Sequence, residues 1–204
     1  MPRCPHCGES HGPEFHFCGK TGQPLDLGPR LIGQVVLDRF QIVHLLGEGP
    51  VGAVLEVEED VDGHRERYAA KMLHPRFARD KEAVRKFLDE AEKAGGTGHA
   101  HIARVFATGR DTGGAPLVVR EYMEGESLDA YIAQKAPLAV AEAVRIARQV
   151  LDGLSAAHAV GVANLDLSPG DVFLLKGEGN RLDPKLVDFG EAHLKKSIGQ
   201  EAVT

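Results

Sequence analysis

A cluster of glycines begins the part of the chain whose residue types suggest chemistry. Residues 47–52 read Gly-Glu-Gly-Pro-Val-Gly, and the residues that follow alternate between apolar and polar types, as in a β-strand. A glycine-rich hairpin between two strands can bring its backbone amides close to the phosphates of a nucleotide, because no side chain keeps the phosphates away. The same residues also suit an ordinary β-turn, so the motif needs support from elsewhere in the chain.

Four charged side chains occupy positions that would be unusual for isolated charges. Lys71 lies at the centre of the otherwise apolar run 68–73, where an ammonium group is costly unless it is paired. Glu90, on the helix expected next, lies close enough to the apolar face of that helix to be the partner. Asp188 ends a short apolar run, and Asp166 precedes this run by about the length of a small hairpin. Taken singly, each charge is better explained as an exposed residue at a strand end or in a loop.

All three cysteines lie near the N-terminus. Cys4 and Cys7 form a Cys-x₂-Cys pair and Cys18 follows, which resembles a zinc ribbon. The position expected for the fourth ligand holds Thr21, which is a poor zinc ligand. A structural zinc site of four ligands would therefore need one of three histidines: His6, His11 or His16. Cys4, Cys7 and Cys18 are candidate zinc ligands, and a degenerate ribbon without metal is the alternative.

The elements that must position these residues follow from hydrophobic periodicity. Strands are expected at 40–46, 51–57, 67–73, 103–108, 116–122, 172–175 and 185–187, and helices at 80–94, 128–133 and 139–159. Asp62-Gly63 is expected to turn a hairpin, because both residues tolerate positive φ. Strands and helices do not alternate regularly, so the sequence indicates an α+β fold.

Two of the expected helices carry an apolar stripe. The stripe of the first comprises Val84, Phe87, Leu88 and Ala91, and the pairs Glu82–Lys86 and Asp89–Lys93 are expected elsewhere on its surface. The stripe of the long helix comprises Val144, Ala147, Leu151 and Leu154.

Composition divides the chain near residue 30. Residues 1–22 form the zinc-ribbon-like segment, which is too short to fold on a core of its own. Residues 23–32, with two prolines and a glycine, are expected to be a linker, and residues 33–204 form the main domain. The 43% of apolar residues excludes wholesale disorder.

Charge and hydropathy exclude several classes of protein. The chain has 30 acidic and 24 basic residues and a net charge of −6, so nucleic acid is not an expected partner. No apolar run approaches the roughly 20 residues that cross a bilayer, so no membrane association is expected. The odd cysteine count argues against a disulfide framework, and we expect a cytoplasmic protein.

Taken in order, the motifs resemble those of the eukaryotic-type Ser/Thr protein kinase family, over residues 33–190. Leu31-Ile32-Gly33 and Arg39-Phe40 look especially like its bacterial members. The resemblance implies a protein-kinase-like fold with a β-rich N-lobe and a helical C-lobe. The sequence ends soon after Asp188-Phe189-Gly190, so we expect a C-lobe that is only partial.

The resemblance also implies residue roles, with Mg²⁺ and ATP as cofactors. The residues implied to bind ATP are Leu46, Gly47, Gly49, Gly52, Val54, Lys71, Glu121 and Met123. Lys71 would bind the α/β-phosphates and pair with Glu90, and Asp166 would accept the proton of the substrate hydroxyl. Asp171 and Asp188 would hold Mg²⁺.

Several residues depart from the family pattern. Ser168 stands where the family has a lysine, and losing one electrostatic stabiliser of this kind costs roughly 10²–10³ in rate. Leu165 replaces the usual partner of a phosphorylated activation segment, and Asn164 and Asp171 replace histidine and asparagine. Arg120 stands at the gatekeeper position, where it would crowd the adenine site.

Two functional classes remain open. The first is a Ser/Thr protein-kinase-like ATP-binding protein whose phosphotransfer is weak or absent, and retained Lys71, Glu90, Asp166 and Asp188 favour it. The second is a pseudokinase scaffold or regulatory binding module that acts through protein–protein contacts. ATP and a protein partner or substrate are the expected partners. Self-association is also expected, because the long helix is left with an uncovered apolar face.

Overall fold

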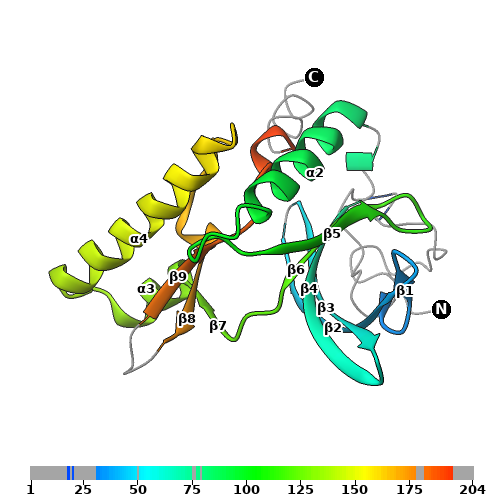
Figure 1. The fold of residues 1–204 in the computed structure, drawn as a ribbon, viewed down its shortest axis with the longest axis horizontal. Helices are drawn as coiled ribbons and strands as arrows, with labels where there is room; N and C mark the ends of the chain where they lie inside the picture. Colours follow the sequence, from blue (N-terminus) through cyan, green and yellow to red (C-terminus); the bar gives the residue numbers. More distant parts are fainter. Residues whose placement is uncertain are drawn as a thin grey trace.

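The computed structural model describes residues 18, 20, 31–49, 51–74, 77–78, 80–177 and 182–194 of the 204-residue chain. The expected zinc-ribbon-like segment and linker therefore lie almost entirely outside the described residues. The described residues form two parts: a larger sheet with a helix against it, and a smaller sheet with two helices (Figure 1).

The larger sheet has six antiparallel strands in the spatial order β1-β2-β3-β4-β6-β5. They are β1 (Val35–Val36), β2 (Phe40–Glu48), β3 (Gly52–Val61), β4 (His64–Leu73), β5 (Val105–Arg110) and β6 (Pro116–Glu121). The strands expected in this region are confirmed, and β1 is too short to give a period-two signal. Asp62 and Gly63 turn the β3–β4 hairpin as expected, with φ of 54° and 82°.

One face of the larger sheet encloses the first core. Every second side chain of a strand lies on the same face, and the sheet curls along β2, β3 and β4 (Figure 1). The apolar side chains of one face form a single buried cluster. The most deeply buried members are Phe40, Ile42, Ala53, Leu55, Val57, Ala70, Leu117 and Val119.

Helix α2 (Lys81–Gly95) covers the opposite face of the sheet, where it packs against Val51, Leu73 and Val118. The carboxylate of Asp80 caps the helix by accepting a hydrogen bond from the backbone N–H of Ala83 (3.0 Å). The expected stripe is confirmed: three of its members are buried and the fourth packs against them, namely Val84, Phe87, Ala91 and Leu88. Both expected i,i+4 ion pairs are present, at 3.1 and 2.9 Å.

The smaller part follows a short connecting segment, residues 122–124. It comprises β7 (Gly125–Ser127), α3 (Leu128–Lys135), α4 (Val140–Ala159), the 3₁₀ turn η2 (Pro169–Asp171), β8 (Val172–Lys176) and β9 (Leu182–Leu186). Its sheet has the order β7-β8-β9, and α4 lies against β9. The sequence pattern did not predict the three-residue strand β7. Within the described ranges, no helix is both long and apolar enough to cross a membrane.

The predicted apolar stripe of α4 is largely uncovered, as expected, and a different side of the helix is packed. Val144 and Leu151 are 61% and 64% exposed, whereas Ile146, Gly153 and Ala157 are buried. Apolar residues occur on more than one side of this helix, so periodicity alone could not identify the packed side. Gly153 determines which side of α4 is packed. A Cβ atom at position 153 would lie 2.8 Å from the carbonyl oxygen of His101, so only glycine allows the observed approach.

Candidate functional site

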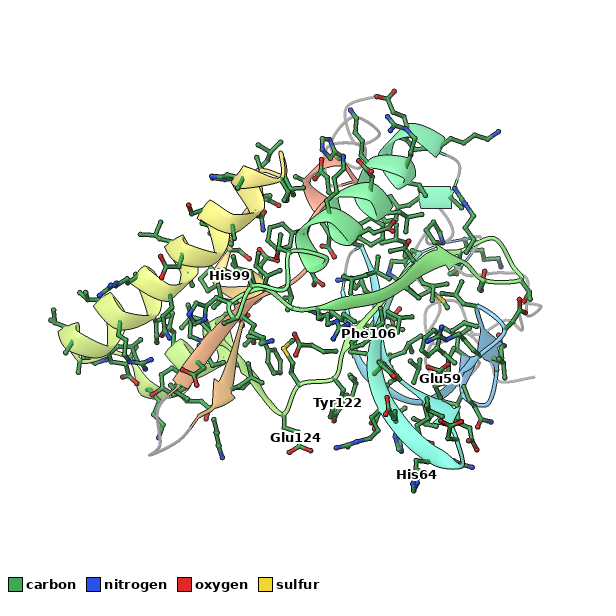
Figure 2. All side chains as sticks on the ribbon, in the orientation of Figure 1. Glu59, His64, His99, Phe106, Tyr122 and Glu124 are labelled. Atoms are coloured by element: carbon green, nitrogen blue, oxygen red, sulfur yellow. The ribbon has the colours of Figure 1, made fainter. Side chains whose placement is uncertain are left out.

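A cleft of about 610 Å³ lies between the two parts of the molecule. Figure 2 labels Tyr122 and Glu124 on the segment that joins the two parts beside this cleft. Five residues predicted to bind ATP line the cleft: Leu46, Gly47, Val54, Glu121 and Met123. The structure therefore brings together residues of β2, β3 and the connecting segment that are far apart in the sequence.

A backbone hydrogen bond links the two ends of the glycine-rich turn. The backbone N–H of Gly49 donates to the carbonyl oxygen of Gly52 (2.9 Å), and a Cβ atom on Gly52 would overlap the backbone of Met72. Neither Gly49 nor Gly52 lines the cleft. Sequence reasoning missed His74, a fully buried residue whose Nε2 lies 2.8 Å from the carbonyl oxygen of Gly49 and whose backbone N–H donates to Val51.

The connecting segment is anchored by the side chain of Glu121. Its carboxylate accepts hydrogen bonds from Lys185 Nζ (2.6 Å) and from the backbone N–H of Arg104 (2.8 Å). The backbone N–H of Glu121 donates to the carbonyl oxygen of Arg104 (2.9 Å). These bonds fix the strand end from which Met123 enters the cleft.

Lys71 is held by two carboxylates inside the molecule. Its Nζ lies 2.8 Å from Glu191 Oε1 and 3.2 Å from Asp188 Oδ2, and its side chain is 11% exposed. Burial by itself would lower the pKa of Lys71, but the carboxylates of Asp188 and Glu191 outweigh burial and raise this pKa above its ordinary value. Lys71 is therefore an ammonium group at neutral pH, with its charge already compensated.

The predicted contact between Lys71 and Glu90 is not formed. Among the described residues, Glu90 is instead paired with His193, whose Nε2 lies 2.9 Å from Glu90 Oε1. Glu191 and His193 belong to one helical turn after Gly190, so this turn supplies both the carboxylate on Lys71 and the imidazole on Glu90.

Packing fixes the turn that contains Glu191 and His193. Gly190 has a φ of +84°, and a Cβ atom there would lie 2.8 Å from the Cα atom of Phe87 on α2. Leu194, at the other end of the turn, is fully buried in the cluster that includes α2. The turn is therefore wedged against α2, between the two residues predicted to pair.

Arg120 adds a second buried cation to the site. Its side chain is 10% exposed and its Nη2 lies 3.6 Å from Asp188 Oδ1. Arg120 lines the cleft and also a small cavity of about 20 Å³ that it shares with Lys71 and Asp188. In the part of the chain that is described, Nε and Nη1 of Arg120 have no hydrogen-bond partner.

The loop that carries Asp166 is stabilised by Ser168 and Asp171. Asp171 Oδ2 accepts hydrogen bonds from the backbone N–H (2.7 Å) and the hydroxyl (2.8 Å) of Ser168. Asp166 is exposed on the same loop, and its backbone N–H donates to the side chain of Asn164 (3.3 Å). Ser168, predicted only as the loss of a lysine, therefore forms a new local contact with Asp171.

The two aspartates predicted to hold Mg²⁺ do not present an open metal site. The carboxylate of Asp188 is ion-paired with Lys71 and Arg120. Oδ2 of Asp171 accepts a hydrogen bond from Ser168. Mg²⁺ demands oxygen ligands in near-octahedral geometry, and these carboxylates do not fit it in this arrangement. Among the described residues, no three His, Cys, Asp or Glu side chains gather as a metal site.

The predicted zinc site cannot be traced in full. Cys18 is buried, whereas Cys4 and Cys7 lie outside the described residues. Zinc binding therefore stays a prediction from the sequence.

Comparisons with known proteins agree with this architecture. Residues 40–203 match the family model described as the protein kinase domain. The chain is 33% identical to the serine/threonine-protein kinase Pkn1 of Myxococcus xanthus, over 94% of this chain and 29% of that protein. It is also 33% identical to the serine/threonine-protein kinase PrkC of Bacillus subtilis, over 79% of this chain and 24% of that protein. The chain thus spans less than a third of the length of these relatives.

Solved structures show the same fold. The kinase domain of Mycobacterium tuberculosis PknI matches with a TM-score of 0.68 and 30% identity, over 78% of this chain and 62% of that chain. A structure of Rad53 in complex with AMP-PNP matches with a TM-score of 0.64 at 22% identity, over 75% of this chain and 39% of that chain, which supports the fold alone. The fold, the order of the motifs and the family match agree, and the chain belongs to the protein kinase domain family, with bacterial Ser/Thr kinases among its relatives.

Proposed function

We propose that the chain is a Ser/Thr protein-kinase-like domain that binds ATP in the cleft and transfers phosphate weakly or not at all. The observation that carries this proposal is the placement of Lys71, which is bound by Glu191 while Glu90 is bound by His193. Phosphotransfer in this family needs the lysine–glutamate pair and a metal on the aspartate of the Asp-Phe-Gly motif. In the described arrangement Lys71 and Glu90 are not paired, and the Asp188 carboxylate is paired with Lys71 and Arg120.

The roles of the cleft residues follow from their positions and from family membership. Leu46 and Val54 would contact the adenine ring, and the backbone of Glu121 and Met123 would bond its edge. The amides of the glycine-rich turn, with Gly47 facing the cleft, would lie over the phosphates. Relatives named as Ser/Thr kinases support ATP as the nucleotide and a protein as the partner or substrate.

Binding of ATP requires one exchange of partners. Glu191 and a phosphate group compete for the same ammonium group, because both are anions that seek Lys71. The ordered nucleotide would take over the charge compensation that Glu191 now supplies. If the turn that contains Glu191 and His193 moved away, Glu90 would be released from His193 and could approach Lys71.

Asp166 is the candidate base for transfer to a hydroxyl group. It is exposed on a loop that Ser168 and Asp171 brace, so a substrate hydroxyl has access to its carboxylate. The loop nevertheless carries no cation at position 168, and the missing charge would leave the transferred phosphoryl group less stabilised. The proposed outcome is a slow reaction at best.

A second function, a binding module for a protein partner, is favoured by the apolar surface of the smaller part. An open apolar hollow of about 360 Å³ lies among α3, α4 and the loop that precedes β8. On α4, Val140, Val144 and Leu151 are 80%, 61% and 64% exposed. Exposed apolar patches of this kind commonly mark interfaces.

Two measurements on the purified chain test the proposal. Titration calorimetry with ATP reports binding, and transfer of label from γ-labelled ATP to the chain itself and to a generic protein substrate reports catalysis. Asp166→Asn is the control for transfer. ATP binding with little or no label supports the proposal, strong label that the control abolishes makes the chain an efficient kinase, and absence of binding by the folded chain favours the binding module.

A further inference from the structure

We propose that Arg120 takes the place of a divalent cation at Asp188, so that the cleft binds a nucleoside phosphate without Mg²⁺. This inference rests on the proposed function of the cleft. It identifies Arg120 as a residue that determines ligand and metal specificity, and it gives a role to the departure from the family pattern at this position.

The strand register directs Arg120 toward the phosphate-binding lysine. On the paired strands β4 and β6, Lys71 lies opposite Val118 and Ala69 lies opposite Arg120. Lys71 and Arg120 are therefore diagonal neighbours on the same face of the sheet. Alanine at position 69 leaves room beside the long side chain of Arg120.

Arg120 compensates the carboxylate that would otherwise bind a metal ion. Its Nη2 lies 3.6 Å from Asp188 Oδ1, while Lys71 Nζ lies 3.2 Å from Asp188 Oδ2. A Mg²⁺ ion at ~2.1 Å from Oδ1 would lie within about 6 Å of the guanidinium group. Two like charges at this distance in a partly buried site repel each other, and arginine cannot relieve the repulsion by losing its proton.

The free donors of Arg120 point to an anionic ligand. Its side chain is nine-tenths buried, and among the described residues no acceptor bonds its Nε or Nη1. Arg120 lines the open cleft while Nε and Nη1 are themselves covered, so a ligand in the cleft would reach these donors once the side chain turns toward it. A phosphate oxygen is the acceptor best suited to a guanidinium group, because the planar fork of donors matches phosphate geometry.

The charges around Asp188 balance without a metal ion. Lys71 and Arg120 supply two positive charges, and Asp188 and Glu191 supply two negative charges, all on side chains that are at most 15% exposed. A bound phosphate group can replace Glu191 on Lys71 and also accept from Arg120. At Lys71 one phosphate oxygen then takes over the compensation that the Glu191 carboxylate supplies, and Arg120 provides a second cation for the remaining phosphate charge.

The first experiment measures metal binding by the chain alone, with Mn²⁺ detected by electron paramagnetic resonance. We compare the natural sequence with Arg120→Met, and with Arg148→Met as the control for loss of one arginine. Arg148 is exposed on α4 and does not line the cleft. We expect Arg120→Met to bind Mn²⁺ at least about tenfold more tightly than the natural chain and the control. Tight binding by the natural chain, or equal weak binding by all three, overturns the proposal.

The second experiment measures ATP affinity in EDTA and in excess Mg²⁺. The natural chain should bind ATP equally in both, within about twofold, whereas Arg120→Met should lose about tenfold in EDTA. Binding by the natural chain that requires Mg²⁺ overturns the inference. If no ATP binds in either buffer, the proposed function fails, while the Mn²⁺ result still decides the role of Arg120 at Asp188. Circular dichroism checks folding, and Arg120→Gln replaces the methionine variant if that variant does not fold.

Discussion

The two parts of the molecule bury their apolar residues to very different extents. In the larger sheet, Phe40, Leu55 and Leu117 are completely buried. In the smaller part, α4 leaves Val144 and Leu151 more than 60% exposed beside an open apolar hollow. The residues predicted to bind the nucleotide come mainly from the larger sheet, which we call the closed part because its core is fully buried. Asp166 lies on an exposed loop of the smaller part.

This difference separates binding from catalysis. A side chain can hold a ligand precisely only when its own position is fixed by packing and by second contacts. Lys71 and Arg120 meet this condition, because each is buried and ion-paired. Asp166 lies in more open surroundings. Nucleotide binding is therefore the better supported half of the proposed function.

The largest expected effect tests the comparison directly with one chemical change made in each part. Leu117→Ala, in the closed core, should lower the free energy of unfolding by about 3 kcal/mol through lost burial and a residual cavity. Leu151→Ala, on the exposed side of α4, should change it by less than about 0.5 kcal/mol. Urea unfolding followed by circular dichroism measures both. A large loss for Leu151→Ala would show that this face is covered in solution, for example by a second copy, and sedimentation would then reveal the oligomer.

The next effect concerns the turn that holds Lys71. Glu191→Gln removes one of the two carboxylates that pair with Lys71. ATP should then bind about tenfold more tightly, because its phosphates no longer compete with the Glu191 carboxylate for Lys71. Titration calorimetry measures the affinity. Glu82→Gln, which breaks an exposed ion pair on α2, is the matched control and should leave the affinity unchanged. Unchanged or weaker binding by Glu191→Gln would contradict the competition.

A smaller effect is expected in the exposed loop. Ser168→Ala removes the hydroxyl that donates to Asp171 and should lower the free energy of unfolding by about 1 kcal/mol. ATP affinity should stay the same, since Ser168 does not line the cleft. Thermal unfolding and calorimetry provide the two readings, with Ser155→Ala on the exposed side of α4 as the control. A loss of ATP affinity in Ser168→Ala would show that the loop containing Ser168 contributes to nucleotide binding.

The smallest effect is a pH dependence at the edge of the closed part. The hydroxyl of Tyr68 donates to Glu66 (2.6 Å), and this hydrogen bond, together with burial, raises the pKa of Tyr68 to about 12 from an ordinary value of 10.0. A raised pKa means that the fold favours the neutral phenol, so its contribution is complete below pH 10 and is lost as the pH rises through 12. Tyr68→Phe should cost up to about 1 kcal/mol at pH 8, and the difference should shrink above pH 10.

Absorbance titration provides an independent check on Tyr68. The chain contains three tyrosines, and the one that ionises near pH 12 should disappear in Tyr68→Phe. A stability difference between the two proteins that stays constant through this range would show that the Glu66 contact is not its cause.

Periodicity and turn chemistry predicted much of the fold. The strands 40–46, 51–57 and 67–73 and the helix 80–94 were each recognisable, because alternation and the 3.6-residue stripe are local signals. The ranges of β1 and β7 were not, since two or three residues carry no period. The uncovered apolar face of α4, with Val144 and Leu151 exposed, was expected, but its packed side was not identified, because Gly153 contributes no hydrophobic signal although it determines the close contact.

The candidate site was predictable as a set of residues but not as a set of contacts. The family resemblance placed Leu46, Val54 and Met123 in one cleft, and the structure brings them together there. The partner of Lys71 was not predictable, because Glu90 and Glu191 are both acids and the path of the chain after Gly190 selects between them. The roles of Asp166 and Asp171, and zinc binding by the cysteines, stay predictions.

The sequence by itself determined the family, the order of the elements and the charged residues of the site, since these follow from local pattern and motif order. Only the tertiary structure decided which charges compensate one another. Lys71, Arg120, Asp188 and Glu191 come from separate segments, and ion pairs depend on distances of a few ångströms that packing alone sets. The turn after Gly190, wedged against α2, thereby separates the two residues whose pairing the motifs predicted.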